Sequence, residues 1–343
     1  MKFSDARIVA AATAAVVLTL VAGQTVPAVA APTPSPTPSP SASDPAAAAK
    51  DKLKQLEDQA SSIGEQYDSV SDALDAGKAK LKVLQDDIAL QQKKVDELSA
   101  AAQTIALAQF RNRDFDTTVQ IFTSSDPDSL LDRLSTASRV DETMNTTLSE
   151  QQAAQANLDD MQRSAQAEVA ALADQEKQLA DLKKQIDAKV SAADQVYKSL
   201  SGQDQQAVDG GTTTSDPGDY ADADARIKTA ISYALSKVGK AQYVWGADGP
   251  SGYDCSGLML ASYRAAGISL PHSSRTMSTM GMAVSKSDLK PGDLIFFYNP
   301  VHHVGMYIGG GKFVHARNTR VDLVVQTLAS YPAPWAGARR IIR

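Results

Sequence analysis

The residue types best suited to covalent chemistry are gathered in the last third of the chain. The single cysteine, Cys255, is followed within 60 residues by all four histidines, which are His272, His302, His303 and His315. A hydrolytic cysteine attacks as the thiolate, so it needs a base that takes its proton and a third group that orients the base. A cysteine hydrolase is therefore the leading hypothesis for this part of the chain.

The segment around Cys255 predicts a helix with the cysteine in its first turn. This helix extends from Asp254 towards Gly267, where glycine can supply the positive φ that a helix end often requires. A helix N-terminus carries a partial positive charge, which favours a thiolate. A lone cysteine can also be a buried inert thiol or an intermolecular link, and these alternatives stay open at this point.

The N-terminus has the pattern of a secretion signal. Lys2 and Arg7 give a positive start, residues 8–22 form an apolar stretch, and Ala28-Val29-Ala30 is a small-residue cleavage site. Residues 1–30 are therefore predicted to be a signal peptide, with an uncleaved membrane anchor as the alternative. The mature chain is expected to be secreted. Residues 31–45, rich in Pro, Ser and Thr, predict an extended linker.

Residues 46–200 predict a coiled coil. Steps that alternate between three and four residues, starting at Leu53, meet an apolar side chain at every position up to Ile105 except Gly77 and Gln91. A second, looser seam extends from Leu130 to Val196. The simplest arrangement is an all-α antiparallel hairpin with its tip near 110–129, and a parallel dimer is the competing arrangement. The apolar tip residues are Phe110, Phe115, Ile121 and Phe122.

The remainder of the chain predicts a linker and then a compact domain. Residues 201–221 are rich in Gly, Thr, Asp and Ser and predict a flexible linker. Residues 222–343 begin with an amphipathic helix at 226–238, continue with the Cys255 helix and then turn to short β-prone runs. These runs lie at 294–298, 304–308, 312–316 and 321–327, and Gly309-Gly310-Gly311 predicts a hairpin. Helices followed by strands indicate an α+β domain with an antiparallel sheet.

Charge separates the two parts of the chain and narrows the classes of function. Residues 222–343 carry 14 Lys and Arg against 7 Asp and no Glu, a net charge of +7, whereas the remainder carries 20 basic and 33 acidic residues, a net charge of −13. A basic domain suits an anionic polymer. No interleaving of aromatic and basic residues supports nucleic acid as a partner. The absence of Glu and the scatter of Asp argue against a glycosidase, which needs two positioned carboxylates.

Six short motifs, in order, resemble the NlpC/p60 family of cell-wall cysteine endopeptidases over about the last 120 residues. They are Tyr243-Val244-Trp245-Gly246, Gly252-Tyr253-Asp254-Cys255-Ser256-Gly257-Leu258, Leu270-Pro271-His272-Ser273-Ser274, Pro291-Gly292-Asp293-Leu294-Ile295-Phe296-Phe297, His303-Val304-Gly305-Met306-Tyr307-Ile308-Gly309 and Phe313-Val314-His315-Ala316. The resemblance implies a papain-like core in which Cys255 is the nucleophile, His303 the base and His315 the third polar residue.

The residues themselves are compatible with these implied roles. His303 and His315 fall on neighbouring strands of the predicted hairpin, where both side chains can share one face. Successive strand residues point to opposite faces, so only one of His302 and His303 can face Cys255. The family pattern selects His303, and His302 is expected to lie at the surface. The backbone N–H of Cys255 is the expected oxyanion donor.

The resemblance also implies the substrate and the residues that bind it. Family members cleave stem peptides of peptidoglycan, commonly at the bond between D-γ-glutamate and the diamino acid. Tyr243, Asp254 and Ser256 would line the groove, with Asp254 holding an amine or simply capping its helix. His272 and Ser273 follow Leu-Pro, and His272 stands where arginine is common, a change that bears on carboxylate recognition. A second departure is Ala247, at a position that is frequently glycine.

Two other classes of function and one mode of regulation complete the expectations. A non-catalytic wall-binding division scaffold is the alternative, and a zinc hydrolase using the histidines and Cys255 is less favoured because adjacent strand residues point apart. No metal or cofactor is expected. By analogy with exported wall hydrolases, the protein would be cell-wall associated and act in wall remodelling or daughter-cell separation. Its coil would cover the Cys255 groove, and the tip would dock on a membrane division complex of the ABC-transporter type.

Overall fold

The computed structural model describes residues 44–112, 127–209 and 217–342. The predicted signal peptide, nearly all of the Pro/Ser/Thr-rich linker and the tip residues Phe115, Ile121 and Phe122 lie outside the described residues. Within the described ranges, no helix combines the length and the apolar character needed to span a bilayer.

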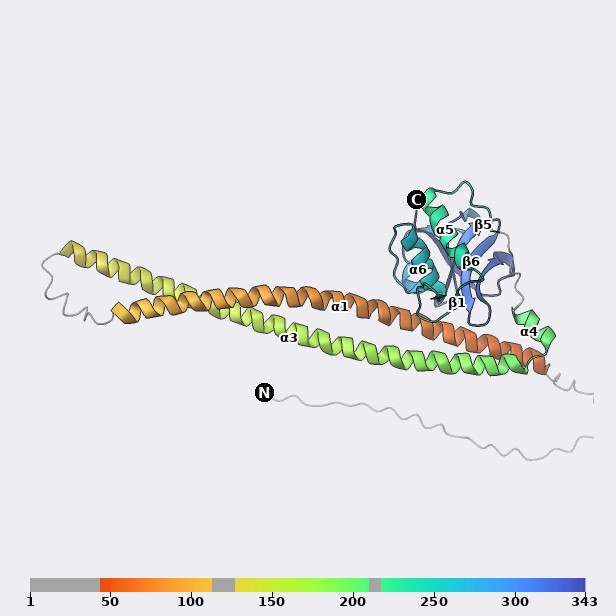
Figure 1. The fold of residues 1–343 in the computed structure, drawn as a ribbon, viewed down its shortest axis with the longest axis horizontal. Helices are drawn as coiled ribbons and strands as arrows, with labels where there is room; N and C mark the ends of the chain where they lie inside the picture. Colours follow the sequence, from red (N-terminus) through yellow and green to blue (C-terminus); the bar gives the residue numbers. More distant parts are fainter. Residues whose placement is uncertain (1–43, 113–126, 210–216, 343) are drawn as a thin grey trace, which may run out of the picture. The chain divides into compact units, whose positions relative to one another are not determined.

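Two long helices form the first part of the described chain (Figure 1). Helix α1 comprises Pro45–Asn112 and helix α3 comprises Pro127–Ser199. Lys80 pairs with Glu168 at 2.6 Å, and Gln109 donates to Asp141 at 3.0 Å, so the two helices pack antiparallel within one chain. The predicted antiparallel hairpin is confirmed, and the start of α3 at a proline agrees with proline's preference for the first helical position.

Both exceptions in the first seam are explained by contacts with α3. A Cβ atom at Gly77 would come within 2.7 Å of Leu172 Cδ2, so glycine makes room for a leucine of the partner helix. Gln91 donates through Nε2 to the carbonyl oxygen of Ala154 at 2.8 Å. The seam therefore stays closed at both positions, and Leu53, Leu74 and Val95 are buried along it.

The predicted flexible linker at 201–221 is partly wrong, because α4 occupies Gly202–Asp209. Ser201 Oγ accepts from the backbone N–H of Asp204 at 3.2 Å, which caps the start of this helix. At the other end, the guanidinium of Arg317 donates to the last two carbonyl oxygens at 2.8 and 2.9 Å. A tertiary contact thus stabilises a helix that composition alone did not indicate.

The C-terminal domain is built on a six-stranded sheet in which every neighbouring pair is antiparallel. The strand order is β3-β8-β4-β5-β6-β7, and a separate parallel pair is formed by β1 and β2. The strands are β1 (Gln242–Tyr243), β2 (Gly252–Tyr253), β3 (Met282–Val284), β4 (Leu294–Phe297), β5 (His303–Gly309), β6 (Lys312–Asn318), β7 (Asp322–Thr327) and β8 (Trp335–Arg340).

Helices α5 (Ala225–Lys237) and α6 (Cys255–Ala265) pack on this sheet, and the short α7 (Ser274–Met277) follows them. One buried core joins Ile231 of α5, Leu258 of α6 and Met306 of β5. The predicted α+β class and the four predicted strands are confirmed, including the hairpin whose glycines 309–311 all have positive φ. Strands β1, β2, β3 and β8 were not predicted. The first two are only two residues long, and the sequences of β3 and β8 show no regular alternation of apolar and polar residues.

Candidate active site

Cys255 is the first residue of α6 and lies against the start of β5. Asp254 caps the helix by accepting from the backbone N–H of Gly257 at 2.6 Å. Gly267 ends it with a φ of +76°, as the sequence predicted. Cys255 is only 5% exposed, and its sulfur lies close enough to the backbone N–H of Val304 for that group to oppose the rise in the thiol pKa. Because Val304 directly follows His303, this contact places the thiol beside the strand end that carries His303.

The two histidines form a hydrogen-bonded chain that ends on Gln326. His303 Nε2 lies 2.8 Å from His315 Nδ1, and His315 Nε2 lies 3.1 Å from Gln326 Oε1. An amide oxygen only accepts, so His315 carries its proton on Nε2 and accepts from His303 Nε2–H. His303 Nδ1 is then the unprotonated nitrogen. Gln326 was missed from the sequence, where a glutamine in a β-prone run gives no signal.

Aromatic rings pack around this chain. The ring of Tyr331 lies 5.7 Å from His303 and 5.2 Å from His315, measured between centroids. Phe313 lies 4.4 Å from His315, and Phe297 packs on Tyr331 at 4.7 Å. Burial raises the pKa of Tyr331, Arg317 opposes this, and ionisation of Cys255 would raise that pKa further. Tyr331 was not predicted as a site residue.

Burial holds both the thiol and the imidazole in their neutral forms. Burial first, and then the carboxylates of Asp254, Asp68 and Glu65, raise the pKa of Cys255 well above its usual range, while the Val304 N–H opposes this. Burial also lowers the pKa of His303 to about 3. In the arrangement described here, the pair is therefore thiol and imidazole, and not thiolate and imidazolium.

His302 is not a surface residue, so that expectation was wrong. Its ring stacks on Tyr298 with centroids 4.1 Å apart, and its Nδ1 lies 2.9 Å from the carbonyl oxygen of Pro300. Its own carbonyl oxygen accepts from Ser61 Oγ of α1 at 2.7 Å. The alternation of strand residues predicted different faces for His302 and His303. It could not show that α1 covers the face on which His302 lies.

The predicted substrate-binding residues lie together on the side of Cys255 that faces α1. Ser256 Oγ donates to Asp254 Oδ1 at 2.9 Å, and His272 Nε2 lies 3.1 Å from both oxygens of that carboxylate. Tyr243 is buried against Trp245, with ring centroids 4.9 Å apart. Ser273 is buried and caps α7 by accepting from the N–H of Thr276 at 3.1 Å.

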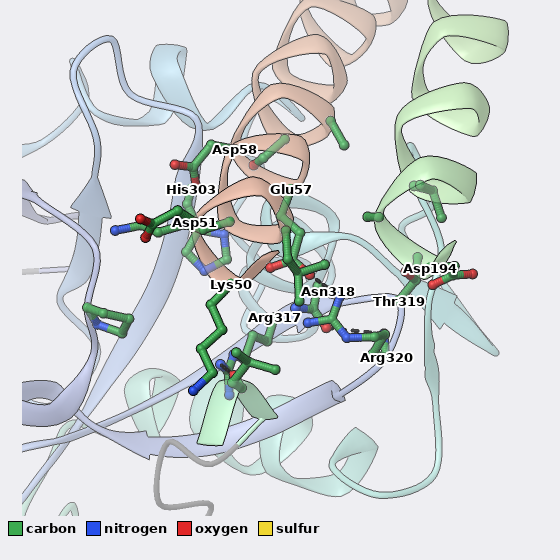
Figure 2. Close-up of a pocket in the computed structure, with 18 of the residues that line it drawn as sticks. Lys50, Asp51, Glu57, Asp58, Asp194, His303, Arg317, Asn318, Thr319 and Arg320 are labelled. Carbon is green, nitrogen blue, oxygen red and sulfur yellow. Dashed lines mark hydrogen bonds and ion pairs between the residues drawn. The ribbon is translucent and has the colours of Figure 1, made fainter. Parts of the chain in front are cut away.

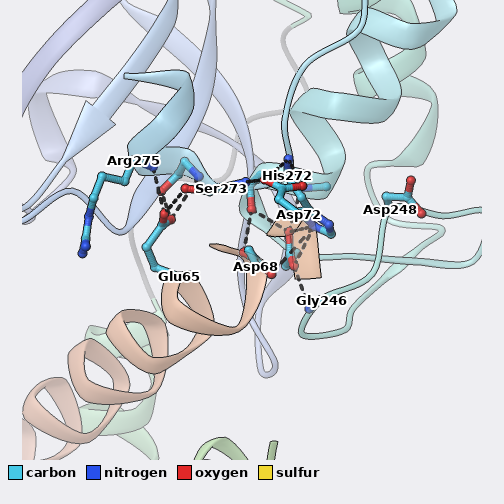
Figure 3. A network of polar contacts seen from close by, with 12 residues as sticks. Glu65, Asp68, Asp72, Gly246, Asp248, His272, Ser273 and Arg275 are labelled. Atoms are coloured by element: carbon cyan, nitrogen blue, oxygen red, sulfur yellow. Dashed lines mark hydrogen bonds and ion pairs between the residues drawn. The ribbon is translucent and has the colours of Figure 1, made fainter. Parts of the chain in front are cut away.

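An acidic face of α1 covers these residues, as Figure 3 shows. Glu65, one turn before Asp68, is buried, and its carboxylate accepts from the hydroxyls of Ser273 and Ser274. It also accepts from the backbone N–H groups of Ser274 and Arg275, both at 3.0 Å. All four donors belong to the start of α7.

Two further carboxylates continue this contact along α1. Ser256 Oγ, 3.1 Å from Asp68 Oδ2, shares its single proton between Asp254 and Asp68. Asp72 accepts from the backbone N–H groups of His272 and Ser273 at 3.0 and 3.1 Å. Burial acts to lower the pKa of His272, but Asp254, Asp68 and Asp72 outweigh it and raise that pKa to about 10. Side chains at 65, 68 and 72 recur at helical spacing, so they form one strip, the acidic strip, on a face of α1 outside the seam.

A cavity of about 310 Å³ remains beside the acidic strip, between the coil and the domain. Figure 2 shows His303 at its wall together with Glu57 and Asp58 of α1. Arg320 joins the two parts here, since it pairs with Glu57 and lies 3.4 Å from Asp209 of α4. The imidazole thus borders a partly open space, while α1 fills the Asp254 side of the site.

A thiol at the start of a helix, packed against a sheet that carries a histidine pair, defines a papain-like cysteine hydrolase domain. Residues 239–339 match the NlpC/P60 family. A probable endopeptidase of Corynebacterium glutamicum is 34% identical over 143 residues, which cover 42% of this chain and 68% of that protein. The chain therefore belongs to the NlpC/P60 family.

Other relatives match the same domain. A gamma-D-glutamyl-L-lysine dipeptidyl-peptidase of Bacillus cereus is 38% identical over 107 residues, covering 29% of this chain and 32% of that protein. A probable endopeptidase of Mycobacterium tuberculosis is 44% identical over 110 residues, and the chain spans only 28% of its length. Among solved structures, the NlpC/p60 domain of the peptidoglycan hydrolase SagA is 28% identical with a TM-score of 0.31, and the match covers 33% of this chain and 97% of that domain.

Proposed function

We propose that this protein is a secreted, cell-wall-associated peptidoglycan endopeptidase that acts in wall remodelling or daughter-cell separation. It would cleave stem peptides between D-γ-glutamate and the diamino acid, with Cys255 as nucleophile, His303 as base and His315 as the residue that orients the base. The hydrogen-bonded chain from His303 through His315 to Gln326, next to a cysteine in the first turn of a helix, carries this proposal. The relative named as a gamma-D-glutamyl-L-lysine peptidase supports the choice of bond.

The chemistry follows from the proton positions in this chain. The Cys255 thiol gives its proton to His303 Nδ1, and the sulfur attacks the γ-carbonyl carbon of D-glutamate. The oxyanion is received by the backbone N–H of Cys255 at the helix start. His303 then gives the proton to the departing amine of the diamino acid, which leaves a thioester. Water, deprotonated by His303, attacks the thioester and releases the γ-carboxyl product and the thiol.

The groove residues would hold the stem peptide around that bond. Asp254 carries a carboxylate that suits the free amine at the start of a trimmed stem peptide. Ser273 and Ser256 offer hydroxyls for its polar groups, and Tyr243 supplies an apolar wall. His272 would contribute one cationic ring in place of the two-pronged guanidinium of arginine, which makes carboxylate recognition weaker and less directional.

Substitution of Gln326 should lower kcat, which depends on the orientation of the base, and should leave substrate binding nearly unchanged. Gln326→Leu removes the acceptor for His315 Nε2–H, so the tautomer that frees His303 Nδ1 loses its support. We expect kcat to fall by about 10–100-fold with little change in KM, by comparison with other partners that orient a catalytic group. Gln326→Glu retains an acceptor oxygen and should recover most of kcat. Equal loss in both variants would contradict this role.

We further propose that α1 keeps the enzyme inactive until its acidic strip leaves the groove. Glu65, Asp68 and Asp72 occupy the polar groups that the substrate would use, and two of them also raise the pKa of the thiol. The strip thus excludes substrate and disfavours the thiolate at once. A partner that binds the coil would release it, and the membrane division complex considered above is one candidate, for which Phe110, 72% exposed near the end of α1, offers an apolar contact.

Removal of the coil tests the inhibitory role directly. Residues 222–343 alone should hydrolyse peptidoglycan fragments faster than the full chain at equal molar concentration, because the groove is then open to substrate. Release of soluble peptides, followed by reversed-phase chromatography, measures this difference. Equal rates for the two proteins would remove the inhibitory role of α1 while leaving the peptidase intact.

A further inference from the structure

We propose that Asp68, Asp254 and His272 form a site for a divalent transition-metal ion, best suited to Zn²⁺, that clamps α1 onto the catalytic domain. The three side chains come from α1, from the cap of α6 and from the loop before α7. Figure 3 shows Asp68 and His272. One ligand atom from each lies within 4.8 Å of the others. Asp68 is 4% exposed, Asp254 is 2% exposed, and the side chain of His272 is 12% exposed.

An unpartnered carboxylate oxygen points to a cation at this place. Asp68 Oδ2 accepts from Ser256 Oγ, but Asp68 Oδ1 is buried and accepts no hydrogen bond from any residue in the described ranges. It lies 4.0 Å from His272 Nε2, beyond hydrogen-bond distance. Leaving a buried carboxylate oxygen without a partner is costly, and a metal ion between it and the imidazole would satisfy it.

The spacing and types of the donors fit zinc. Ligands placed tetrahedrally at about 2.0–2.2 Å from a zinc ion are roughly 3.3–3.6 Å apart. His272 Nε2 is 3.1 Å from Asp254 and 4.0 Å from Asp68, so the observed separations bracket this range. One imidazole with two carboxylates favours zinc over magnesium or calcium, which prefer oxygen ligands alone. Water would complete the coordination.

The surroundings already hold one ligand in position. The Asp254 carboxylate accepts from the backbone N–H groups of Gly246 and Gly257 at 2.7 and 2.6 Å, and from Ser256 Oγ. Such outer contacts orient metal ligands in known sites. Zn²⁺ would displace the proton of His272, and two carboxylates, the resulting neutral imidazole and the dication then sum to zero charge. The ion would also remove the repulsion between Asp68 and Asp254, which raises the pKa of Asp68 after the larger effect of burial.

The site exists only while α1 covers the groove, so binding of the ion would stabilise the covered form. Asp68 belongs to α1, whereas Asp254 and His272 belong to the catalytic domain. An ion that binds this covered form shifts the equilibrium towards it, by about 100-fold when its concentration is 100 times its dissociation constant. The ion would therefore be a regulator and not a catalyst. This consequence rests on the proposed function, but binding of the ion does not.

Binding is tested on the full chain carrying Cys255→Ser, so that the thiol cannot supply a ligand. After exhaustive chelation, Zn²⁺ is titrated by calorimetry in the presence of a competing chelator. We expect one ion per chain, and a loss of affinity of at least about 10-fold when Asp68→Asn is added. The matched control is Asp87→Asn, at an exposed acidic residue of the same helix. Unchanged affinity in the Asp68→Asn protein would overturn the proposal.

Zinc-edge X-ray absorption on the unsubstituted chain distinguishes this site from the thiol. We expect a first shell of nitrogen and oxygen with one imidazole and no sulfur. A zinc–sulfur distance of about 2.3 Å would place the ion on Cys255 and would also overturn the proposal. Zn²⁺ should slow peptide hydrolysis by the full chain about 10-fold or more, and the Asp68→Asn protein should resist this. If no variant hydrolyses peptidoglycan, the binding results still decide the site and only the proposed function fails.

Discussion

Replacement of Cys255 by alanine should abolish the release of peptides from purified sacculi. The sulfur is the only group in the proposed mechanism that forms a bond to the substrate, so its loss removes the covalent route altogether. By comparison with the loss of a nucleophile in other hydrolases, we expect a fall on the order of 10⁴-fold or more in kcat/KM. Release of soluble peptides, measured over several hours at high enzyme concentration, is sensitive enough to detect it.

The control for this experiment is binding to the same sacculi. The alanine substitution removes one sulfur atom at a helix start, so the domain should retain its fold and its affinity for the wall. Co-sedimentation with sacculi should therefore be unchanged while hydrolysis is lost. Unchanged lysis in the Cys255→Ala protein would instead support a protein that binds the wall as a division scaffold.

Loosening the acidic strip should raise the activity of the full chain. Glu65→Gln places an amide N–H₂ among four donors, and Asp72→Asn does the same against two backbone N–H groups. A hydrogen bond to a charged group contributes about 1.5–3 kcal/mol to stability. The double variant neutralises both carboxylates and places amide N–H₂ groups opposite donors, so the contact between α1 and the domain is weakened. We expect kcat/KM of the double variant to increase on the order of 10–100-fold, provided that the covered form predominates in the unmodified chain.

The matched control changes the same charges on the same helix without touching the domain. Asp75 and Asp87 are exposed, so Asp75→Asn with Asp87→Asn should leave activity within about twofold. Circular dichroism should show the same helix content in both double variants, because none of the four positions belongs to the seam. Iodoacetamide should also alkylate Cys255 faster in the Glu65→Gln, Asp72→Asn protein. No gain in activity or alkylation would exclude inhibition by the strip.

The elements that place the thiol and the histidines could be predicted because their signals are local. Asp254 before the apolar Cys255 helix, Gly267 after it and the three glycines at 309–311 each fix a boundary by backbone chemistry. The two apolar seams of the coil are also local patterns, and they predicted that the two helices pack as an antiparallel hairpin. Strand β8 lacked such a signal, since its place in the sheet is set by pairing with β3 and β4 and not by its own residues.

The acidic strip could not be predicted, because carboxylates outside a coiled-coil seam usually face water. Glu65 and Asp68 have the residue types of an ordinary exposed helix face, and only the fold brings buried donors of α7 and α6 opposite them. His302 was placed at the surface for the same reason, since the helix that covers it lies some 240 positions earlier. Gln326 and Tyr331 were missed because their roles depend on which ring of a distant strand they meet.

Mass spectrometry of the peptides released from defined peptidoglycan by the Glu65→Gln, Asp72→Asn protein tests the central claim most directly. If the Cys255 and His303 pair is a stem-peptide peptidase freed by loss of the strip, the products should carry a new amino terminus on the diamino acid and a free γ-carboxyl group on D-glutamate. These products should be absent when Cys255→Ala is added. Fragments cut within the glycan, or the same peptides released without the cysteine, would contradict it.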